Sequence, residues 1–274
     1  MCVVLPNGKI TSGQDIIPHK KTKNRNFKKN LMILSILIVI LTFTQRIWSE
    51  EVTCDSTDDI YLQGVFLHGL GDSPKGWSFL KQQRFANVDW TLPGGTKRPI
   101  TVSRGFEMNG WFDVFDRPVD SKSRDDESGI LESVAQIHSV LDELIEAGAR
   151  SENIFVGGFS QGGSVALLAT YTYSKRLSGC ICLSGWLQLR DQFSTLLKDT
   201  NRDTPTFWGH GTRDPMVLVD TLETGVNVLD EHLTSTIDVH EYEGMKHRIT
   251  TEEMQHLNEW IASIRKDREE QCAV

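Results

Sequence analysis

The sequence predicts an α/β fold in which a mostly parallel central sheet is flanked by helices. From about residue 60 onward, short apolar runs alternate with amphipathic helical patterns, as parallel strands joined by crossover helices require. A Gly-x-Ser-x-Gly motif stands between one apolar run and a helical pattern, and polar loops follow two later runs. Active sites of such sheets form at the carboxyl ends of the strands, so we expect function to reside in these loops.

The first half of this pattern contains two strands and a long helix. Residues 63–67 and 88–92 are apolar runs that end at a glycine-containing loop and at a Pro-Gly-Gly turn. Residues 128–147 are predicted as a helix, because their apolar side chains recur on one stripe and Gly148 follows as a stop signal. A charged loop at residues 122–127 precedes this helix.

The second half begins with a buried strand at residues 153–159 and an Ala- and Leu-rich helix at residues 163–172. An amphipathic helix at residues 251–266 closes the pattern, with Thr250 or Thr251 near its cap. Three further apolar runs, separated by helices, are predicted as strands: residues 180–183, 206–208 and 237–242.

Length and composition indicate one globular domain with appended segments. The chain has 274 residues, of which 39% are hydrophobic and 24% charged, as is ordinary for a globular protein. We expect one α/β domain at residues 60–266. An N-terminal segment with a linker occupies residues 1–59, and a C-terminal tail occupies residues 267–274.

Charge and cysteine usage argue against two kinds of partner. The formal net charge of -8 disfavours nucleic acid, since phosphate binding needs a concentrated basic face. The five cysteines lack the spacing of metal ligands, so we expect no metal site. They are Cys2, Cys54, Cys180, Cys182 and Cys272.

The N-terminal segment predicts a membrane-directed signal. Residues 31–43, from Leu31 to Phe43, form an apolar run that is interrupted by Ser35 and Thr42. The run is short for a spanning helix, which needs about 20 residues, but it suits a signal peptide or signal anchor. An extension with no role in folding is the alternative. Six basic residues precede the run: Lys20, Lys21, Lys23, Arg25, Lys28 and Lys29.

Ser160 is the predicted nucleophile, because it is the central residue of a Gly-Phe-Ser-Gln-Gly motif between a buried strand and a helix. In a nucleophile elbow the serine has a strained backbone, and the flanking Gly158 and Gly162 let neighbouring elements approach closely. The start of the following helix also favours developing negative charge. A glycine-rich turn that only joins strand and helix is the alternative.

A serine nucleophile needs a general base and an orienting carboxylate, which in folds with this elbow follow it in the order Ser, Asp, His. Asp214 and His247 each follow an apolar run, so both are expected in loops at the carboxyl ends of strands. We therefore predict the catalytic set Ser160, Asp214 and His247. His210 precedes the acid in a predicted turn and is expected to support it, and the other candidates lie in helices or strands.

Two backbone N–H groups are predicted to hold the oxyanion that forms during acyl transfer. One belongs to Gln161, the residue after the nucleophile. The other belongs to Leu70, in the His-Gly-Leu-Gly-Asp loop that follows the first strand. A simple glycine-containing turn is the alternative interpretation of this loop.

These motifs, in this order, resemble the acyl-protein thioesterase, lysophospholipase and carboxylesterase group of α/β-hydrolases. The resemblance covers most of the chain after residue 60 and implies the α/β-hydrolase fold. It rests on residues 68–77 (the oxyanion loop), 105–113 (Met…Trp-Phe-Asp), 158–163 (the elbow), 183–187, 210–215 (the acid) and 244–247 (the base).

The resemblance implies a serine hydrolase of acyl thioesters or esters that needs no cofactor, with a palmitoyl-protein thioesterase as the first expectation. A lysophospholipase or broad carboxylesterase is the alternative, and a catalytically silent protein that binds lipid or acylated partners is the alternative of another class. The resemblance also implies an apolar acyl groove beside Ser160. Its expected lining, which fits ordinary core packing equally well, is Leu70, Trp77, Met108, Trp111 and Trp186.

The sequence departs from the family pattern at two loops and in its N-terminal segment. Residues 216–218 lack the proline that is usual after the acid, and residues 248–250 replace small polar residues after the base. Both changes are expected to alter the rim of the acyl pocket. The family is mainly cytosolic and implies a cytoplasmic location, whereas residues 31–43 predict a membrane anchor or the secretory pathway.

Overall fold

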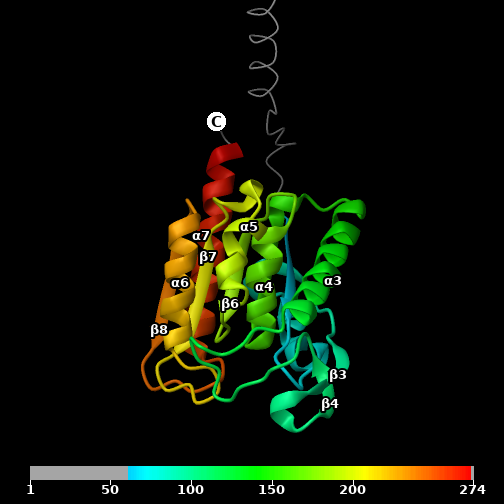
Figure 1. The fold of residues 1–274 in the computed structure, drawn as a ribbon. Helices are drawn as coiled ribbons and strands as arrows, with labels where there is room; N and C mark the ends of the chain where they lie inside the picture. Colours follow the sequence, from blue (N-terminus) through cyan, green and yellow to red (C-terminus); the bar gives the residue numbers. More distant parts are fainter. Residues whose placement is uncertain (1–60, 273–274) are drawn as a thin grey trace, which may run out of the picture. The chain divides into compact units, whose positions relative to one another are not determined.

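Six parallel strands form the central sheet of the structure, a computed structural model that describes residues 61–272. Their order across the sheet is β2-β1-β5-β6-β7-β8 (Figure 1). The strands are β1 (Leu62–Leu67), β2 (Val88–Thr91), β5 (Ile154–Phe159), β6 (Gly179–Leu183), β7 (Thr206–Gly211) and β8 (Ile237–Tyr242). The predicted α/β fold with a mostly parallel sheet is therefore confirmed. The predicted segment at residues 1–59, with its apolar run, lies outside the described residues.

The strand register brings the candidate loops to one edge of the sheet. Leu67 at the end of β1 pairs with Gly158, and Phe159 at the end of β5 pairs with Leu183. Leu183 in turn pairs with Gly209, and the parallel ladder continues from β7 to β8. Because all these strands run in the same direction, the loops that follow them gather at their carboxyl ends.

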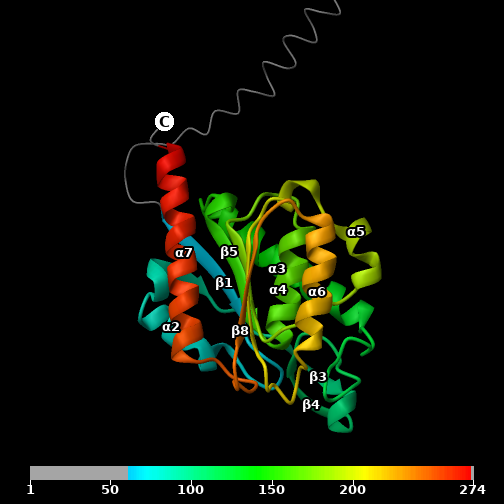
Figure 2. The ribbon, with the colours of Figure 1, turned by 90° about the vertical axis from the view of Figure 1, so that its left-hand side faces the viewer.

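Helices cover both faces of the sheet, as Figure 2 shows. The helices α3 (Glu127–Glu146), α4 (Gln161–Thr172) and α6 (Asp220–His232) cover one face, while α2 (Ser78–Gln82) and α7 (Thr251–Cys272) cover the other. Each face has its own apolar core, one built around Val165 and Leu168 of α4 and the other around Leu257 and Ile261 of α7. The inner strands β1, β5, β6 and β7 are thus buried on both sides, which is why they read as near-continuous apolar runs.

The local sequence explains where α3 begins and how α4 is buried. The side chain of Asp126 accepts a hydrogen bond from the N–H of Gly129 at 3.1 Å and caps the first turn of α3. The apolar stripe of α3, which includes Ile130 and Ile137, faces the core. In contrast, every residue of α4 from Gln161 to Tyr171 is buried, so this helix lies within the domain.

Several elements differ from the sequence prediction. The segments β3 (Thr96–Ile100) and β4 (Phe106–Gly110) form a separate antiparallel hairpin that was not predicted. The last helix, α7, continues six residues beyond its predicted end at Lys266, because its polar pattern stays compatible with a helix. One turn of helix, α5, and six short 3-10 helices complete the described part: α5 (Phe193–Leu196), η1 (Pro74–Trp77), η2 (Phe85–Asn87), η3 (Thr101–Ser103), η4 (Ser151–Asn153), η5 (Arg190–Gln192) and η6 (Asp199–Asn201). None of the helices within residues 61–272 combines the length and the apolarity needed to cross a membrane.

Candidate active site

Ser160 occupies a strained turn between the end of β5 and the start of α4. Its backbone angles are φ 55° and ψ -123°, in a region that residues with a side chain rarely adopt. The N–H of Ser160 donates a hydrogen bond to the carbonyl of Leu183 at 2.7 Å, which fixes this conformation against β6. The turn presents the serine side chain at the carboxyl edge of the sheet, as the motif predicted.

The two glycines of the motif are required by close backbone contacts. A Cβ atom on Gly158 would lie 2.3 Å from the carbonyl carbon of Gly162, and one on Gly162 would lie 2.2 Å from the carbonyl oxygen of Leu67. Any side chain at either position would push α4 away from β5 or β1. The elbow therefore depends on glycine for space, although neither residue has a positive φ.

His247 connects Ser160 to Asp214. Its Nε2 lies 2.8 Å from the Oγ of Ser160, and its Nδ1 lies 2.6 Å from Oδ2 of Asp214. The ring also packs against Phe159, with 4.9 Å between ring centroids. With the Nδ1 proton directed at the carboxylate, Nε2 is free to accept the serine proton. The structure thus brings together all three residues of the predicted catalytic set.

Asp214 is held as a charged group by its surroundings. Its Oδ1 accepts hydrogen bonds from the backbone N–H groups of Met216 at 2.8 Å and Val217 at 3.0 Å. Burial by itself would raise the pKa of Asp214, but the hydrogen bond and charge of His247, together with these two N–H groups, lower the pKa below its ordinary value. The carboxylate that orients His247 is therefore ionised at neutral pH.

His210 lies on β7 and not in the predicted turn, because this strand continues to Gly211. The side chain is fully buried, and its Nε2 lies 2.9 Å from the carbonyl oxygen of Val217 and 3.8 Å from Oδ2 of Asp214. Burial lowers the pKa of His210. The ring contacts the loop that carries the acid, which is the supporting position that the sequence suggested.

Leu70 and Gln161, the predicted oxyanion donors, both line a pocket with Ser160. Gln161 is the first residue of α4, so its N–H has no acceptor one turn earlier within the helix. The N–H of Leu70 has no acceptor within residues 61–272, whereas the N–H of Gly71 next to it donates to Asn109 at 2.8 Å. Both N–H groups are therefore available to a ligand.

The side chain of Gln161 has a second role that the sequence did not reveal. Its Oε1 accepts a hydrogen bond from the N–H of Trp111 at 2.9 Å, and its Nε2 donates to the carbonyl of Phe112 at 2.5 Å. These bonds attach the segment after β4 to the elbow. Only the three-dimensional proximity of two segments about 50 positions apart reveals this role.

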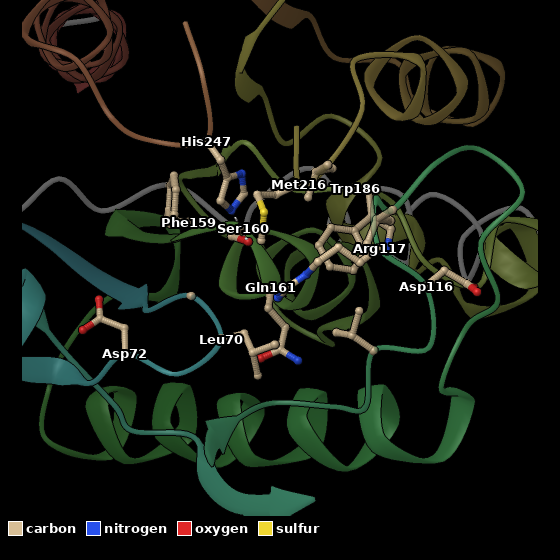
Figure 3. A pocket seen from close by; sticks show the side chains of 14 residues that line it. Leu70, Asp72, Asp116, Arg117, Phe159, Ser160, Gln161, Trp186, Met216 and His247 are labelled. Carbon is tan, nitrogen blue, oxygen red and sulfur yellow. Dashed lines mark hydrogen bonds between the residues drawn. The ribbon is translucent and has the colours of Figure 1, made fainter. Parts of the chain in front are cut away.

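The pocket beside Ser160 is a cavity of about 160 Å³ (Figure 3). Of the five residues expected in an acyl groove, Leu70 and Trp186 line it. Its lining residues are Gly69, Leu70, Asp72, Val114, Asp116, Arg117, Val119, Phe159, Ser160, Gln161, Trp186, Met216, Val217 and His247.

Trp77, Met108 and Trp111 lie elsewhere, which corrects the expected lining of this pocket. Trp77 packs on Phe66 and Phe159 on the α7 side of the sheet, and Trp111 is fully buried with its Nε1 donating to the carbonyl of His68 at 2.8 Å. Met108 packs against the core near the oxyanion loop. The hydrophobic core uses these large side chains, as the alternative interpretation allowed.

Sequence reasoning missed the wall formed by residues 114–119. Val114, Asp116, Arg117 and Val119 all line the pocket, but their segment has neither helical nor strand periodicity. Met216 belongs to residues 216–218, which depart from the family pattern. It also lines the pocket, as expected from a change that alters the pocket rim. No group of three or more His, Cys, Asp or Glu residues among residues 61–272 is placed to hold a metal ion.

Comparisons with known proteins give the family and the relatives of the chain. The family model described as Phospholipase/Carboxylesterase matches residues 63–265. An acyl-protein thioesterase 1 of Cryptococcus neoformans is 33% identical over 219 residues, which cover 74% of this chain and 92% of the relative. Carboxylesterase SOBER1 of Arabidopsis thaliana is 34% identical over 213 residues, which cover 76% and 92%.

Solved structures show the same likeness. The crystal structure of Arabidopsis thaliana SOBER1 has a TM-score of 0.71 and 33% identity, covering 74% of this chain and 99% of that one. The crystal structure of Zea mays acyl-protein thioesterase 2 has a TM-score of 0.67 and 25% identity, covering 76% and 96%.

Proposed function

Because the chain belongs to the phospholipase/carboxylesterase family of α/β-hydrolases, we propose that it hydrolyses acyl thioesters or esters through Ser160. The single observation that carries this proposal is the unbroken hydrogen-bond connection from Ser160 through His247 to Asp214. The available N–H groups of Leu70 and Gln161, in the same pocket, are the hydrogen-bond donors that would stabilise an oxyanion.

In the first half of the reaction, the Oγ of Ser160 attacks the acyl carbonyl carbon while Nε2 of His247 accepts the hydroxyl proton. The carbonyl oxygen becomes an oxyanion, which the N–H groups of Leu70 and Gln161 stabilise. As this intermediate collapses, His247 gives the proton to the departing sulfur or oxygen. The products are a free thiol or alcohol and an acyl ester on Ser160.

In the second half, water replaces the thiol or alcohol. His247 accepts a proton from the water as its oxygen attacks the acyl carbon, and it returns this proton to the Oγ of Ser160 when the free acid leaves. Asp214 stays ionised throughout and stabilises the positive charge that His247 acquires in each half. Its lowered pKa serves this role, because the carboxylate is charged across the neutral range.

Replacement of the nucleophile tests the proposal. Ser160→Ala should lower kcat/KM for p-nitrophenyl butyrate by at least about 10³-fold, since the covalent step is lost. It should also abolish labelling by a fluorophosphonate probe. Ser139→Ala, which changes an exposed serine of α3, is the matched control and should keep full activity. Unchanged activity in Ser160→Ala would contradict the proposed mechanism, and absence of activity and labelling in the unaltered protein would favour a silent binding protein.

For the substrate, we propose palmitoylated protein as the first candidate, because relatives that match over most of their own length are named acyl-protein thioesterases. The size of the cavity favours a second candidate, a short-chain ester. A cavity of about 150 Å³ holds a molecule of the size of benzene, and the cavity beside Ser160 is about 160 Å³. A palmitoyl chain would therefore have to continue beyond the enclosed part.

A chain-length series separates the two candidates. The series uses one peptide acylated on cysteine with butyryl, octanoyl or palmitoyl groups, together with a palmitoyl lysophospholipid. If kcat/KM rises with chain length on the peptide and exceeds that of the lysolipid, the thioesterase proposal stands. A maximum at the butyryl peptide would replace it with the short-chain carboxylesterase, and preference for the lysolipid would replace it with the lysophospholipase.

A further inference from the structure

The pocket beside Ser160 contains one permanent positive charge, Arg117. We propose that its guanidinium binds an anionic group of the substrate, a carboxylate or a phosphate, within reach of the acyl carbonyl at Ser160. This proposal rests on the proposed function and adds to it a residue that determines specificity. The preferred substrate would be an ester or thioester that carries a negative charge close to its reacting bond.

Arg117 is free to bind a ligand. Among residues 61–272, its side chain has no hydrogen bond, ion pair or ring contact, although a guanidinium offers five donors. The neighbouring Arg124 differs, because its guanidinium lies 4.6 Å from the centre of the Phe115 ring. The unpartnered charge is therefore the one that lines the pocket.

The two carboxylates of the pocket do not neutralise Arg117. Asp72 accepts a hydrogen bond from Nε1 of Trp77 at 3.1 Å, and in Figure 3 it lies on the opposite side of Ser160 from Arg117. Asp116 accepts a hydrogen bond from the N–H of Arg124 at 3.2 Å, and Figure 3 shows its carboxylate directed away from Ser160. Asp72 thus lies away from Arg117, and Asp116, although it neighbours Arg117, forms no ion pair with it among residues 61–272.

The backbone beside Arg117 is fixed to the loop that carries the catalytic acid. The N–H of Val119 donates to the carbonyl of Met216 at 2.8 Å, and the N–H of Leu218 donates to the carbonyl of Val119 at 2.8 Å. Val119 itself is buried. Leu218 belongs to residues 216–218, which lack the proline usual in the family, and a proline at position 218 would lack the N–H that Val119 binds. Arg117 thus starts from a positioned backbone, which lowers the entropy lost on binding an anion.

The chemistry of this wall suits a small substrate that is part apolar and part anionic. A guanidinium binds a carboxylate or phosphate through two parallel hydrogen bonds. Val114, Val119, Trp186 and Met216 supply apolar surface next to it. Since Arg117 is exposed, water and salt weaken the attraction, and we expect a preference of about tenfold that falls as ionic strength rises.

Two matched pairs of thioesters test this assignment with the full chain. In the first pair the charge is on the leaving group: S-butyryl-3-mercaptopropionate against its terminal amide. In the second pair it is on the acyl group: S-glutaryl-N-acetylcysteamine against its terminal amide. Thiol release gives kcat/KM for each, and the ratio of acid to amide within a pair reports recognition of the charge. The pair with the higher ratio shows which part of the substrate reaches Arg117.

For the unaltered protein, one ratio should be about ten. Arg117→Gln should bring it close to one, and Arg117→Lys should give an intermediate ratio because the charge remains without the planar fork. Arg104→Gln removes an exposed arginine outside the pocket and should leave the ratio unchanged. Ratios near one for both pairs, or a preference that survives in Arg117→Gln, would overturn the assignment.

Binding measurements keep this result separate from the test of the mechanism. Dissociation constants of the same four thioesters for Ser160→Ala, measured by calorimetry, do not require turnover. Absence of hydrolysis in the unaltered protein would contradict the proposed function, while a tenfold tighter binding of one acid would still support Arg117. Hydrolysis of all four compounds with equal affinity for acid and amide would support the function and exclude the role of Arg117.

Discussion

Two buried carboxyl groups lie beside the same strand, β7, and their surroundings favour opposite protonation states. Asp214 is in the loop that follows β7, and Glu253, near the start of α7, packs against Gly209 inside the strand. Their exposed fractions are 4% and 0%. The pKa of Asp214 is lowered, whereas burial raises the pKa of Glu253 to about 8.

The difference shows that hydrogen-bond partners, and not burial alone, decide the charge of a carboxyl group at this edge of the sheet. Asp214 faces two backbone N–H groups and His247. Within residues 61–272 no side chain donates a hydrogen bond to either carboxyl oxygen of Glu253, and the Thr250 backbone, which lowers the pKa, does not offset the effect of burial. A neutral Glu253 adds no second negative charge to this part of the molecule, so Asp214 provides the charge that orients His247.

Replacing the charged member of this pair should have the largest effect. Asp214→Asn keeps the size of the side chain but removes the negative charge and the acceptor that fixes the proton on Nδ1 of His247. We expect kcat/KM for p-nitrophenyl butyrate to fall by about 10³- to 10⁴-fold. Asp89→Asn, at an exposed aspartate that binds the hydroxyl of Tyr61, is the control and should change activity little. A loss of less than tenfold in Asp214→Asn would show that the carboxylate is not needed.

Replacing the neutral member should change how stability depends on pH. The folded pKa of Glu253, about 8, lies above the ordinary value of 4.5, so the folded protein binds the extra proton between these values. The stability that this proton contributes to the folded state is fully present below about pH 4.5 and is lost as pH rises through 8. The glutamine of Glu253→Gln does not titrate. The unfolding free energy of this variant minus that of the unaltered protein, both measured in urea, should therefore increase as pH rises from 5 to 9. The expected gain is on the order of several kcal/mol.

The neighbouring Glu252 is the matched control for this measurement. It is exposed, so Glu252→Gln should leave the pH dependence of the unfolding free energy unchanged. If Glu253→Gln and the unaltered protein show parallel pH profiles, Glu253 is ionised in the folded protein and the contrast with Asp214 does not hold.

A smaller effect on the free energy of unfolding should come from adding a methyl group at Gly209, in space that the Glu253 side chain occupies. A Cβ atom on Gly209 would lie 2.4 Å from Oε1 of Glu253, so Gly209→Ala should lower the free energy of unfolding by about 1–3 kcal/mol. In a Glu253→Ala background, which removes the carboxyl, most of this loss should disappear. Gly94→Ala, whose Cβ would meet Pro74 at an ordinary 3.5 Å, is the control. Equal losses in both backgrounds would assign the clash to the Tyr242 ring, 3.2 Å away, instead.

The sequence predicted the elements whose patterns come from burial. The inner strands β1, β5, β6 and β7 are mostly apolar because helices cover both faces. Ser160, Asp214 and His247 lie in loops at the carboxyl ends of parallel strands, where the sequence placed them. The glycines of the elbow were predicted for a reason that the contacts of Gly158 and Gly162 bear out.

Features that depend on contacts between distant segments could not be predicted in this way. The hairpin of β3 and β4 is mostly exposed and contains Pro99, so it lacks the alternation that marks a half-buried strand. Arg117 reaches the pocket because the irregular loop at residues 114–119 folds against it, and no local pattern marks this. Glu253 looks like any acidic residue at the start of a helix. Whether Trp111 lines a groove or fills the core depends on packing that no local pattern encodes.

The order of the strands also determines when the site can form as the chain is synthesised. The inner neighbour of β1 is β5, which is made only after the hairpin and α3, and the backbone of Ser160 then depends on Leu183 of β6. Pairing of such distant parallel strands is slow because loop closure opposes it entropically. His247 follows β8, the last strand of the sheet. A nascent chain that ends before this loop therefore carries Ser160 without His247, and the hydrogen-bond connection from Ser160 to Asp214 can form only after the loop has been made.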